Sequence, residues 1–356
     1  MRIAVVGGGI VGLATTYELR KANAEVRCYE AGEPLAARSA GDTRIFRSAH
    51  ANPLLVELAM QAKAGWDRWE ARAGTALVGH EGTIVSGPPA PQWARAMGEA
   101  GAPFELLDGG PVRDRLPARS PVGPFLHDPA GGVIMAQQAG RFLRDRTRNA
   151  LVHATVHRIE ADETGARLLT EAGPWTCDSV IIAAGAGTAA LAATAGLDMP
   201  ADLLHHARFT FPLRDTNAAP ACWLDRSEAW RAGFTTYSHP VGKNGQWTIG
   251  GRLDVNDTRW ELGAETVIER SRAVVTRYVR ESLDGIDPEV IDILYCNHMA
   301  SPASGDGFGA ARTGGVLALW GDNLFKMAPL LGTLLAEAAQ TLTIPEPLAQ
   351  PIPRVL

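Results

Sequence analysis

The sequence lacks the features that would assign it to several large classes of protein. It contains no run of about eighteen apolar residues, which argues against a membrane-spanning helix. Its net charge is −5, so no basic surface for nucleic acid is expected. The four cysteines in 356 residues are too few for a disulfide framework. We therefore expect a cytoplasmic chain that binds neither a membrane nor nucleic acid.

The N-terminal residues also lack the pattern of a signal peptide. After Met1 and Arg2 the chain reads IAVVGGGIVGLA, which has no cleavage site and is interrupted by glycines. Residues 2–6 predict a buried strand, 10–21 an apolar-periodic helix and 25–30 a second strand. A strand, a helix and a strand in this order form a βαβ unit, which predicts a parallel sheet.

A glycine-rich motif lies at the first turn of this unit. Residues 7–12, GGGIVG, match the GxGxxG pattern directly after a strand and at the start of a helix. The glycines permit a tight turn and close approach to a pyrophosphate, and the helix N-terminus supplies amide donors. An acidic residue at the end of the second strand is placed to bind ribose hydroxyls. A purely structural turn is the alternative. The predicted dinucleotide contacts of this unit are Gly7, Gly9, Ile10, Val11, Gly12 and Glu30.

The motif alone does not distinguish FAD from NAD, although Glu30 argues against the 2′-phosphate of NADP. We favour FAD because the motif lies at the very N-terminus and because a second glycine turn, AAGAG at 183–187, follows another predicted strand. A flavin dinucleotide is long and needs contacts from several separated stretches of chain. We therefore add Gly185 to the predicted contacts.

The remaining pattern predicts an α/β fold with a Rossmann-like domain assembled from separated segments. Residues 1–82, 140–204 and 297–356 are assigned to this FAD-binding domain. Alternating strands in 205–296, together with 83–139, indicate an inserted substrate domain built on an antiparallel sheet. Further helices are expected at 53–72, 264–282 and 325–340, and a further buried strand at 315–321.

Residues 41–47, GDTRIFR, carry the clearest resemblance to a known family. They are very similar to the segment after the second strand in the monomeric sarcosine oxidase and N-methyltryptophan oxidase family. That family belongs to the D-amino-acid-oxidase-like flavoproteins. The resemblance implies that Arg44 lies over the flavin and that Arg47 binds the carboxylate of the substrate. A solvated basic turn is the alternative interpretation of the same residues.

Three further stretches resemble this family in the same order along the chain. YSHP at 237–240 is similar to an active-site Tyr-x-x-Pro and makes Tyr237 a pocket residue. CNHMASP at 296–302 keeps a spacing that implies an 8α-thioether between Cys296 and FAD; a buried apolar thiol is the alternative. GDNLFKM at 321–327 implies that its lysine is a second carboxylate ligand; an ordinary first-turn lysine is the alternative. We extend the FAD contacts to Arg38, Thr43, Arg44, Val156, Cys296, Gly321, Asn323, Leu324, Phe325 and Lys326.

Four positions depart from the family pattern. The lysine that activates oxygen in the family corresponds to Thr248, which cannot supply a cation to stabilise developing superoxide. Four residues later, Arg252 takes the place of a histidine and is our candidate for restoring positive charge or extending the anion site. His298 replaces a tyrosine, and Leu324 replaces a glycine. We assign Thr248 and His298 to the substrate pocket, and the departures leave the electron acceptor open.

The expected activity is FAD-dependent oxidation of a C–N bond in a small amino or imino acid, with a secondary or N-alkyl amine favoured. Oxygen is expected to reoxidise the flavin and to give hydrogen peroxide. The alternatives are a flavin-dependent dehydrogenase with another acceptor, an NAD-dependent dehydrogenase and a non-catalytic nucleotide-binding module. The substrate carries a carboxylate, no metal is expected, and the chain is a monomer or a small homo-oligomer. The predicted catalytic residues are Arg44, Arg47, Tyr237, Arg252 and Lys326.

Overall fold

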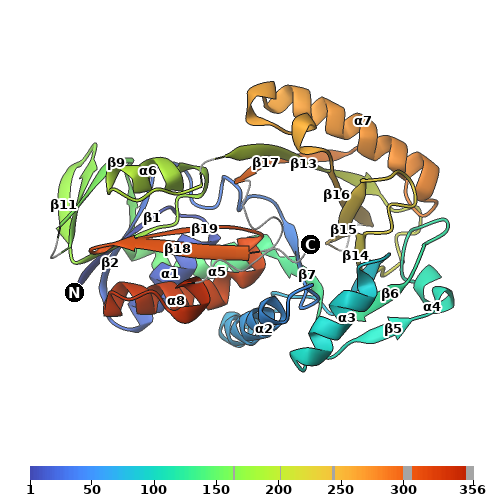
Figure 1. Cartoon of the computed structure of the whole chain (residues 1–356), viewed down its shortest axis with the longest axis horizontal. Coiled ribbons are helices and arrows are strands. Elements are labelled where there is room, and N and C mark those ends of the chain that lie inside the picture. Colours follow the sequence, from blue (N-terminus) through green and yellow to red (C-terminus); the bar gives the residue numbers. More distant parts are fainter. Residues whose placement is uncertain (163–164, 201, 243–244, 300–306, 350–356) are drawn as a thin grey trace.

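Two large sheets organise the chain (Figure 1). The computed structural model describes residues 1–162, 165–200, 202–242, 245–299 and 307–349, with the backbone alone at positions 298 and 299. Figure 1 shows one body around β1, β2 and β19, a second body around β14, β15 and β16, and the strands β13 and β17 extending between them. Among the described residues, no helix combines the length and the apolar character needed to cross a membrane.

The first sheet has six strands in the order β18-β19-β12-β1-β2-β8. Its two central strands, β1 and β12, are almost entirely buried, as expected for a parallel sheet covered on both faces. β18 (Gly307–Thr313) is antiparallel at one edge. The parallel strands are β1 (Arg2–Val6), β2 (Glu25–Glu30), β8 (Leu151–His153), β12 (Ser179–Ile182) and β19 (Val316–Asp322).

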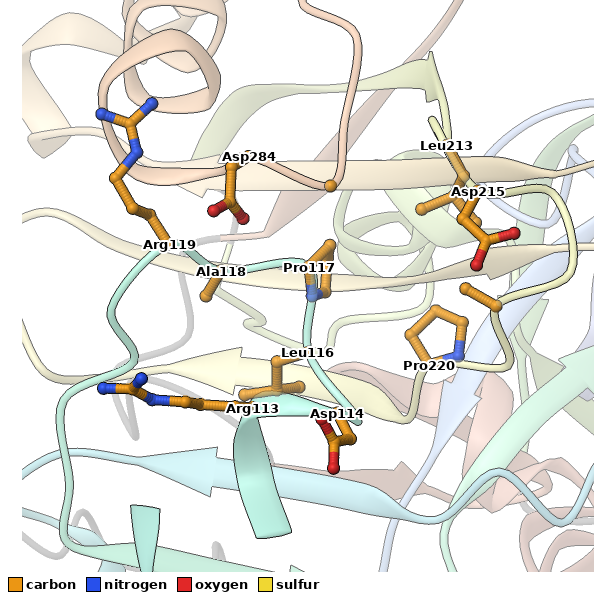
Figure 2. A pocket seen from close by; sticks show the side chains of 12 residues that line it. Arg113, Asp114, Leu116, Pro117, Ala118, Arg119, Leu213, Asp215, Pro220 and Asp284 are labelled. Atoms are coloured by element: carbon orange, nitrogen blue, oxygen red, sulfur yellow. The ribbon is translucent and has the colours of Figure 1, made fainter. Parts of the chain in front are cut away.

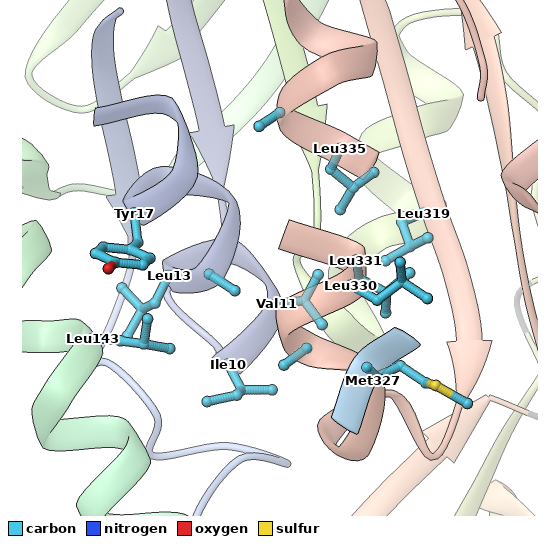
Figure 3. Close-up of a cluster of buried hydrophobic side chains, with 14 of the residues drawn as sticks. Ile10, Val11, Leu13, Tyr17, Leu143, Leu319, Met327, Leu330, Leu331 and Leu335 are labelled. Atoms are coloured by element: carbon cyan, nitrogen blue, oxygen red, sulfur yellow. The ribbon is translucent and has the colours of Figure 1, made fainter. Parts of the chain in front are cut away.

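Three helices, α1 (Ile10–Lys21), α5 (Ala136–Thr147) and α8 (Ala328–Thr341), pack on one face of this sheet. Figure 3 shows their shared core, in which Leu13 of α1 lies near Leu143 of α5 and Leu331 belongs to α8. α8 approaches α1 closely because Gly332 has no side chain; a Cβ there would lie 2.9 Å from the Cβ of Ala14. This packing fixes the start of α1, where the glycine motif lies.

A small antiparallel sheet covers the other face together with α6 (Thr188–Thr194). It consists of β9 (Val156–Ala161), β10 (Ala166–Thr170) and β11 (Gly173–Cys177). The sequence predicts a hairpin followed by a buried strand here, and the structure adds β11. The extra strand forms because Gly173, with φ +103°, turns the chain back along β10.

The second sheet has eight strands in the order β17-β13-β16-β15-β14-β4-β6-β5. All its neighbouring pairs are antiparallel except β14 and β4. α7 (Ala264–Ser282) covers one face with an apolar core. The strands are β4 (Thr83–Ser86), β5 (Glu105–Leu107), β6 (Phe125–Asp128), β13 (Leu203–Pro212), β14 (Cys222–Asp225), β15 (Thr235–Val241), β16 (Gln246–Arg252) and β17 (Asp292–Met299).

A two-stranded ribbon and a long helix lie beside these sheets. β3 (Thr43–Phe46) pairs with β7 (Gly132–Met135), so the arginine segment is a strand and not a solvated turn. α2 (Pro53–Ala73) begins where Asn52 accepts a 2.9 Å hydrogen bond from the Leu54 amide. The shorter helices are α3 (Ala90–Glu99), α4 (Gly109–Arg113), α9 (Glu346–Ala349) and the 3-10 turns η1 (Arg148–Ala150), η2 (Gly185–Gly187), η3 (Val255–Asp257), η4 (Trp260–Leu262) and η5 (Leu324–Met327).

The predicted fold class, a discontinuous dinucleotide-binding sheet with an inserted antiparallel sheet, is confirmed. One predicted helix boundary is wrong: the last long helix begins at Ala328, because residues 324–327 form the tighter turn η5. The residue boundaries of the two domains stay a prediction.

Candidate active site

Close contacts fix two glycines of the loop between β1 and α1. Gly7 has φ +109°, and a Cβ there would lie 2.4 Å from the carbonyl oxygen of Ala183. A Cβ on Gly12 would lie 1.8 Å from the carbonyl oxygen of Gly7. Both positions therefore require glycine. A Cβ on Gly9 would meet only the hydroxyl of Ser39, at 3.3 Å, so the fold itself does not demand glycine there.

The carboxylate of Glu30 is held beside this loop. Its Oε2 accepts a 2.6 Å hydrogen bond from the Gly8 amide, and its Oε1 accepts one of 2.9 Å from the Gly32 amide. At the start of α1, the Ile10 amide donates to the hydroxyl of Ser39 at 3.0 Å. The carboxylate keeps lone pairs that could accept from ribose hydroxyls.

These residues fit a dinucleotide. α1 starts after Gly9 without a side-chain cap from that residue, so its first amides and its positive end face the glycine loop. A pyrophosphate would be held by these amides, and a ribose by Glu30. Val11, in the first turn, anchors the helix start because it is buried in the core.

Arg44 is a half-buried cation on β3. Its guanidinium donates to the carbonyl oxygens of Arg38, at 2.9 Å, and Ala40, and it lies 5.2 Å from the ring centroid of Phe325. Burial, reinforced by the charge of Arg208, lowers the pKa of Arg44 to about 9. Among the described residues, Arg44 has no carboxylate partner.

The turn η5 places Lys326 and Phe325 opposite β3. Phe325 stacks on Trp66 of α2, with 6.3 Å between ring centroids, and the Trp66 indole donates a 2.8 Å hydrogen bond to the carbonyl oxygen of Lys326. The Lys326 side chain is buried. The tryptophan therefore fixes the turn that carries both predicted residues.

The chain enters η5 through three of the other predicted contacts. A Cβ on Gly321 would lie 2.6 Å from the carbonyl oxygen of Gly307, so the strand pair requires glycine. Asn323 takes the left-handed conformation, φ +53°, and Leu324 follows inside η5 and packs against the core. Leu324, which replaces a glycine of the family pattern, has no positive φ.

Arg47 lies in a separate environment. Its guanidinium is 3.2 Å from Nδ1 of His50 and 5.0 Å from the ring centroid of Trp93, and it also donates to the carbonyl oxygen of Ala49. Asp128 fixes this loop by accepting hydrogen bonds of 2.5 Å from the Ser48 amide and 3.0 Å from the Ala49 amide. Sequence reasoning missed Asp128, which reads as an ordinary turn residue before a proline.

One face of the eight-stranded sheet carries the other predicted residues. The pairing of β13, β15, β16 and β17 places Tyr237, Thr248 and Cys296 on the same face. Thr248 lies opposite His239, whose Nε2 is 3.0 Å from the Thr43 hydroxyl, so this face is joined to β3. Burial and the charges of Arg208 and Arg44 hold the pKa of His239 well below its usual range.

Tyr237 and Cys296 lie near Arg44 and Arg208. The Tyr237 hydroxyl is 2.7 Å from Nε2 of His206, and its ring covers Gly250, where a Cβ would lie 2.3 Å from the ring. Burial raises the pKa of Tyr237 to about 12. Burial also raises the pKa of the Cys296 thiol, and the charges of three arginines, Arg38, Arg44 and Arg208, oppose this rise.

The other predicted residues lie on several different elements. Arg38 forms an ion pair with Asp322, at the end of β19. Val156 begins β9, two residues after Ala154, whose amide donates to the Glu30 carbonyl oxygen at 3.0 Å, and Gly185 has φ +57° in η2. Arg252 is exposed at the end of β16, so its part in the site stays a prediction. The side chain of His298 and all of Pro302 lie outside the described residues.

Arg208 is a site residue that sequence reasoning missed. The sequence predicts only a strand for residues 207–213, ARFTFPL, yet this segment has a charge between Ala207 and Phe209, two apolar residues. Strand alternation sends Phe209 into the core under α7 and Arg208 to the face that carries Tyr237. A charged residue in the middle of an apolar strand was the signal available.

A separate cleft of about 360 Å³ lies on the second sheet (Figure 2). It is formed where the chain after α4 meets the end of β13 and the turn after α7, and it contains charges of both signs. It includes none of the predicted site residues. The labelled charged residues that line it are Arg113, Asp114, Arg119, Asp215 and Asp284.

Comparison with known proteins decides the family. Residues 2–338 match the family model described as FAD dependent oxidoreductase (DAO). The chain belongs to this family. FAD is therefore its cofactor, and the protein is an FAD-dependent oxidoreductase. The resemblance inferred from residues 41–47 is confirmed.

Individual relatives are distant in sequence and close in fold. Monomeric sarcosine oxidase from Bacillus sp. (strain B-0618) is 22% identical over 307 residues, which cover 81% of this chain and 78% of that protein. The open form of NikD, an unusual amino acid oxidase essential for nikkomycin biosynthesis, has a TM-score of 0.83 at 20% identity and covers 99% of this DAO chain and 98% of its own. L-proline dehydrogenase from P. horikoshii has a TM-score of 0.78 at 16% identity, and the match covers 97% of this chain and 95% of that chain.

Proposed function

We propose that this protein oxidises a C–N bond of a small amino or imino acid, with a secondary or N-alkyl amine favoured. The observation that carries the proposal is a set of shielded cations: Arg47 and Lys326 are buried, and the half-buried Arg44 lies 5.2 Å from the ring centroid of Phe325, the neighbour of Lys326. Buried cations next to a flavin site suit a substrate that carries a carboxylate. The named activities of the relatives, which include oxidation of sarcosine and other amino acids, support the same class.

Each residue has a proposed part in binding. Arg47 and Lys326 hold the substrate carboxylate and orient the carbon next to the nitrogen toward the flavin. Arg44 would hold the flavin ring, and its guanidinium lies 5.2 Å from the ring centroid of Phe325. Tyr237 lines the pocket, and its raised pKa of about 12 keeps the hydroxyl protonated, so it acts as a hydrogen-bonding group and not as a base.

Bound FAD supplies the acceptor for the two electrons of the reaction. The substrate binds with a neutral amine, the C–H bond next to nitrogen breaks, and its hydrogen leaves with the bonding electron pair. The nitrogen lone pair forms the new C=N bond, so the product is an imine cation that can be hydrolysed by water. No protein base is needed, which agrees with the strongly lowered pKa of His239, which makes it a weak base, and with the protonated state of Tyr237.

The finer points of the proposal concern the cofactor link and the acceptor. We place the attachment of FAD at Cys296, on the sheet face that also carries Tyr237. Oxygen is the proposed acceptor and hydrogen peroxide the product, with a dehydrogenase that uses another acceptor as the second candidate because Thr248 carries no charge. The cytoplasmic location, the small-molecule partner and the monomeric or small oligomeric state stay predictions from the sequence.

The test is turnover of amino and imino acids by the purified holoenzyme, with each acid compared with its own carboxamide. Oxygen uptake and peroxide are measured first, and dye reduction under nitrogen second. The proposal expects turnover of at least one secondary amino acid and none of its carboxamide. Equal turnover of acid and amide would contradict the carboxylate site, and turnover with the dye alone would favour the dehydrogenase.

A further inference from the structure

Arg208 is a buried cation at the junction of the two sheets. It is only 8% exposed and lies in the middle of the second sheet, with Gly250 of β16 on one side and Leu294 of β17 on the other. Because Gly250 has no side chain, the Tyr237 ring covers the position next to Arg208 on this face. The guanidinium of Arg208 reaches Gly41, in the loop before β3.

Two guanidinium groups converge on one glycine of that loop. A Cβ on Gly41 would lie 2.8 Å from Nη2 of Arg208 and 3.4 Å from Nη1 of Arg44. Gly41 has φ +95°, so both its conformation and its contacts favour glycine. The two cations come from different sheets and meet across this position.

The pair is not neutralised by the part of the chain that the structure describes. Arg44 donates to backbone carbonyl oxygens, at 2.8 Å for Thr43 and 2.9 Å for Arg38. The Arg208 side chain has neither a hydrogen bond nor an ion pair with any described residue. A buried charge without a partner is strongly unfavourable, and two like charges at close range add to this cost. Such an arrangement needs an anion from a bound ligand.

The location of the pair indicates which ligand supplies that anion. Gly41 follows Ser39, whose hydroxyl accepts from the Ile10 amide at the start of α1, where the FAD pyrophosphate fits. Arg47, the proposed carboxylate ligand, lies apart beside Trp93 and His50. The pair therefore belongs to the cofactor side of the site. A flavin ring that accepts two electrons and one proton gains one negative charge, and this charge is absent from the oxidised ring.

We propose that Arg208, together with Arg44, binds the negative charge that the flavin ring gains on two-electron reduction and thereby raises its reduction potential. The neighbouring groups agree with this assignment. His239 and the Tyr237 hydroxyl, on the same sheet face, are both neutral, so they do not cancel the field of the arginines. The proposal depends on FAD and not on the identity of the substrate.

The test is the midpoint potential of bound FAD, measured by dye equilibration without any substrate. Arg208→Met removes the charge and keeps the length of the side chain, and Arg208→Lys keeps a charge. Arg272→Met is the matched control, because Arg272 is an exposed arginine on α7, which covers the opposite face of the sheet. We expect Arg208→Met to lower the equilibrium constant for reduction at least tenfold, which is about 30 mV for a two-electron couple. Arg208→Lys should keep most of the potential, and Arg272→Met all of it.

Two further readouts separate the possible failures. If Arg208→Met is purified without flavin, the ratio of its apoprotein's affinities for reduced and oxidised FAD gives the shift in potential from free FAD, because binding and reduction form a closed cycle. This shift is compared with that of the wild type. Acetate and benzoate binding, followed in the flavin spectrum, should change less than threefold. An unchanged potential in a folded, flavin-loaded Arg208→Met protein would overturn the proposal. A loss of acetate binding with an unchanged potential would assign Arg208 to the substrate instead. If no amino acid reacts, the potentials can still be measured, because dye equilibration needs no substrate. That result would count only against the proposed function.

Discussion

Gly12 faces the carbonyl oxygen of Gly7 so closely that a Cβ would lie 1.8 Å from that oxygen. Gly9, in the same motif, has φ −72° and ψ 179°, a conformation open to any residue. Its missing Cβ would meet only the Ser39 hydroxyl, at 3.3 Å. The fold therefore requires Gly12, whereas Gly9 leaves space for the approach of the cofactor.

This difference predicts opposite outcomes for two similar substitutions. Gly9→Ala should keep the free energy of unfolding within about 1 kcal/mol of the wild type and lose at least tenfold in FAD affinity. Gly12→Ala should lose about 3 kcal/mol or more of stability, because a backbone carbonyl cannot move aside cheaply. Denaturant unfolding of the apoproteins and quenching of FAD fluorescence measure the two quantities. Full FAD affinity in Gly9→Ala would show that the cofactor does not approach this position.

Asp128 is expected to support Arg47 through the backbone. Its buried carboxylate accepts from the amides of Ser48 and Ala49, and from that of Ala130 at 3.1 Å. In Asp128→Asn, one oxygen becomes an NH2 group that cannot accept, so at least one of the three amides is left unpaired, at a cost of about 1–3 kcal/mol for each.

The matched control for this substitution is Asp145→Asn, an exposed position on α5. Unfolding gives the stability, and binding of acetate to the holoenzyme gives the effect on Arg47. We expect Asp128→Asn to weaken both and Asp145→Asn to change neither. Normal acetate binding in a destabilised Asp128→Asn protein would limit Asp128 to a role in folding.

His239 should give the protein a pH-dependent stability. Burial and two arginines lower the pKa of His239 well below its usual value in the folded state, whereas the histidine of the unfolded chain titrates near about 6.5. Between these two pKa values the unfolded state binds more protons, so stability falls as the pH drops below about 6.5. The slope due to one such histidine approaches about 1.4 kcal/mol per pH unit.

The measurement is the free energy of unfolding of the apoprotein at several pH values below neutrality. His239→Gln should remove this part of the slope, and His80→Gln, at an exposed histidine, should leave it unchanged. A slope that persists in His239→Gln would mean that other groups cause the acid sensitivity.

Cys296 is predicted to hold the flavin covalently. The wild-type protein should keep its flavin in the pellet after acid precipitation, and Cys296→Ala should release it into the supernatant. Cys222→Ala is the control, because Cys222 is a fully buried thiol on β14, away from β17 in the sheet order. Equal release of flavin from the wild type and Cys296→Ala would return Cys296 to the role of a packed thiol.

The local parts of the fold and site could be predicted from the sequence. α1 and α7 have the boundaries expected from their apolar periodicity, and Glu30 lies beside the glycine loop as its spacing predicts. These features depend on neighbours in the sequence. Residues 41–47, followed by three similar segments in the family's order, were enough to identify the family.

The groups that the sequence did not predict depend on tertiary pairing. Arg208 meets Arg44 because tertiary packing brings together β13 and β3, which belong to different sheets. Asp128 binds the Ser48 amide across 80 residues of chain. The arginine segment itself became a strand because β7, almost ninety positions later, supplies its partner. No local sequence pattern encodes such contacts. For Arg208, the charge inside an apolar strand was the available indication of a site residue.

The most direct test of the account is anaerobic mixing of the flavin-loaded protein with N-methyl, cyclic and ordinary amino acids and with their carboxamides. The account predicts that at least one secondary amino acid bleaches the oxidised flavin spectrum, that its carboxamide does not, and that air or a dye acceptor restores the spectrum. A flavin that dithionite reduces but that no amino or imino acid reduces would contradict the proposed oxidation of a C–N bond.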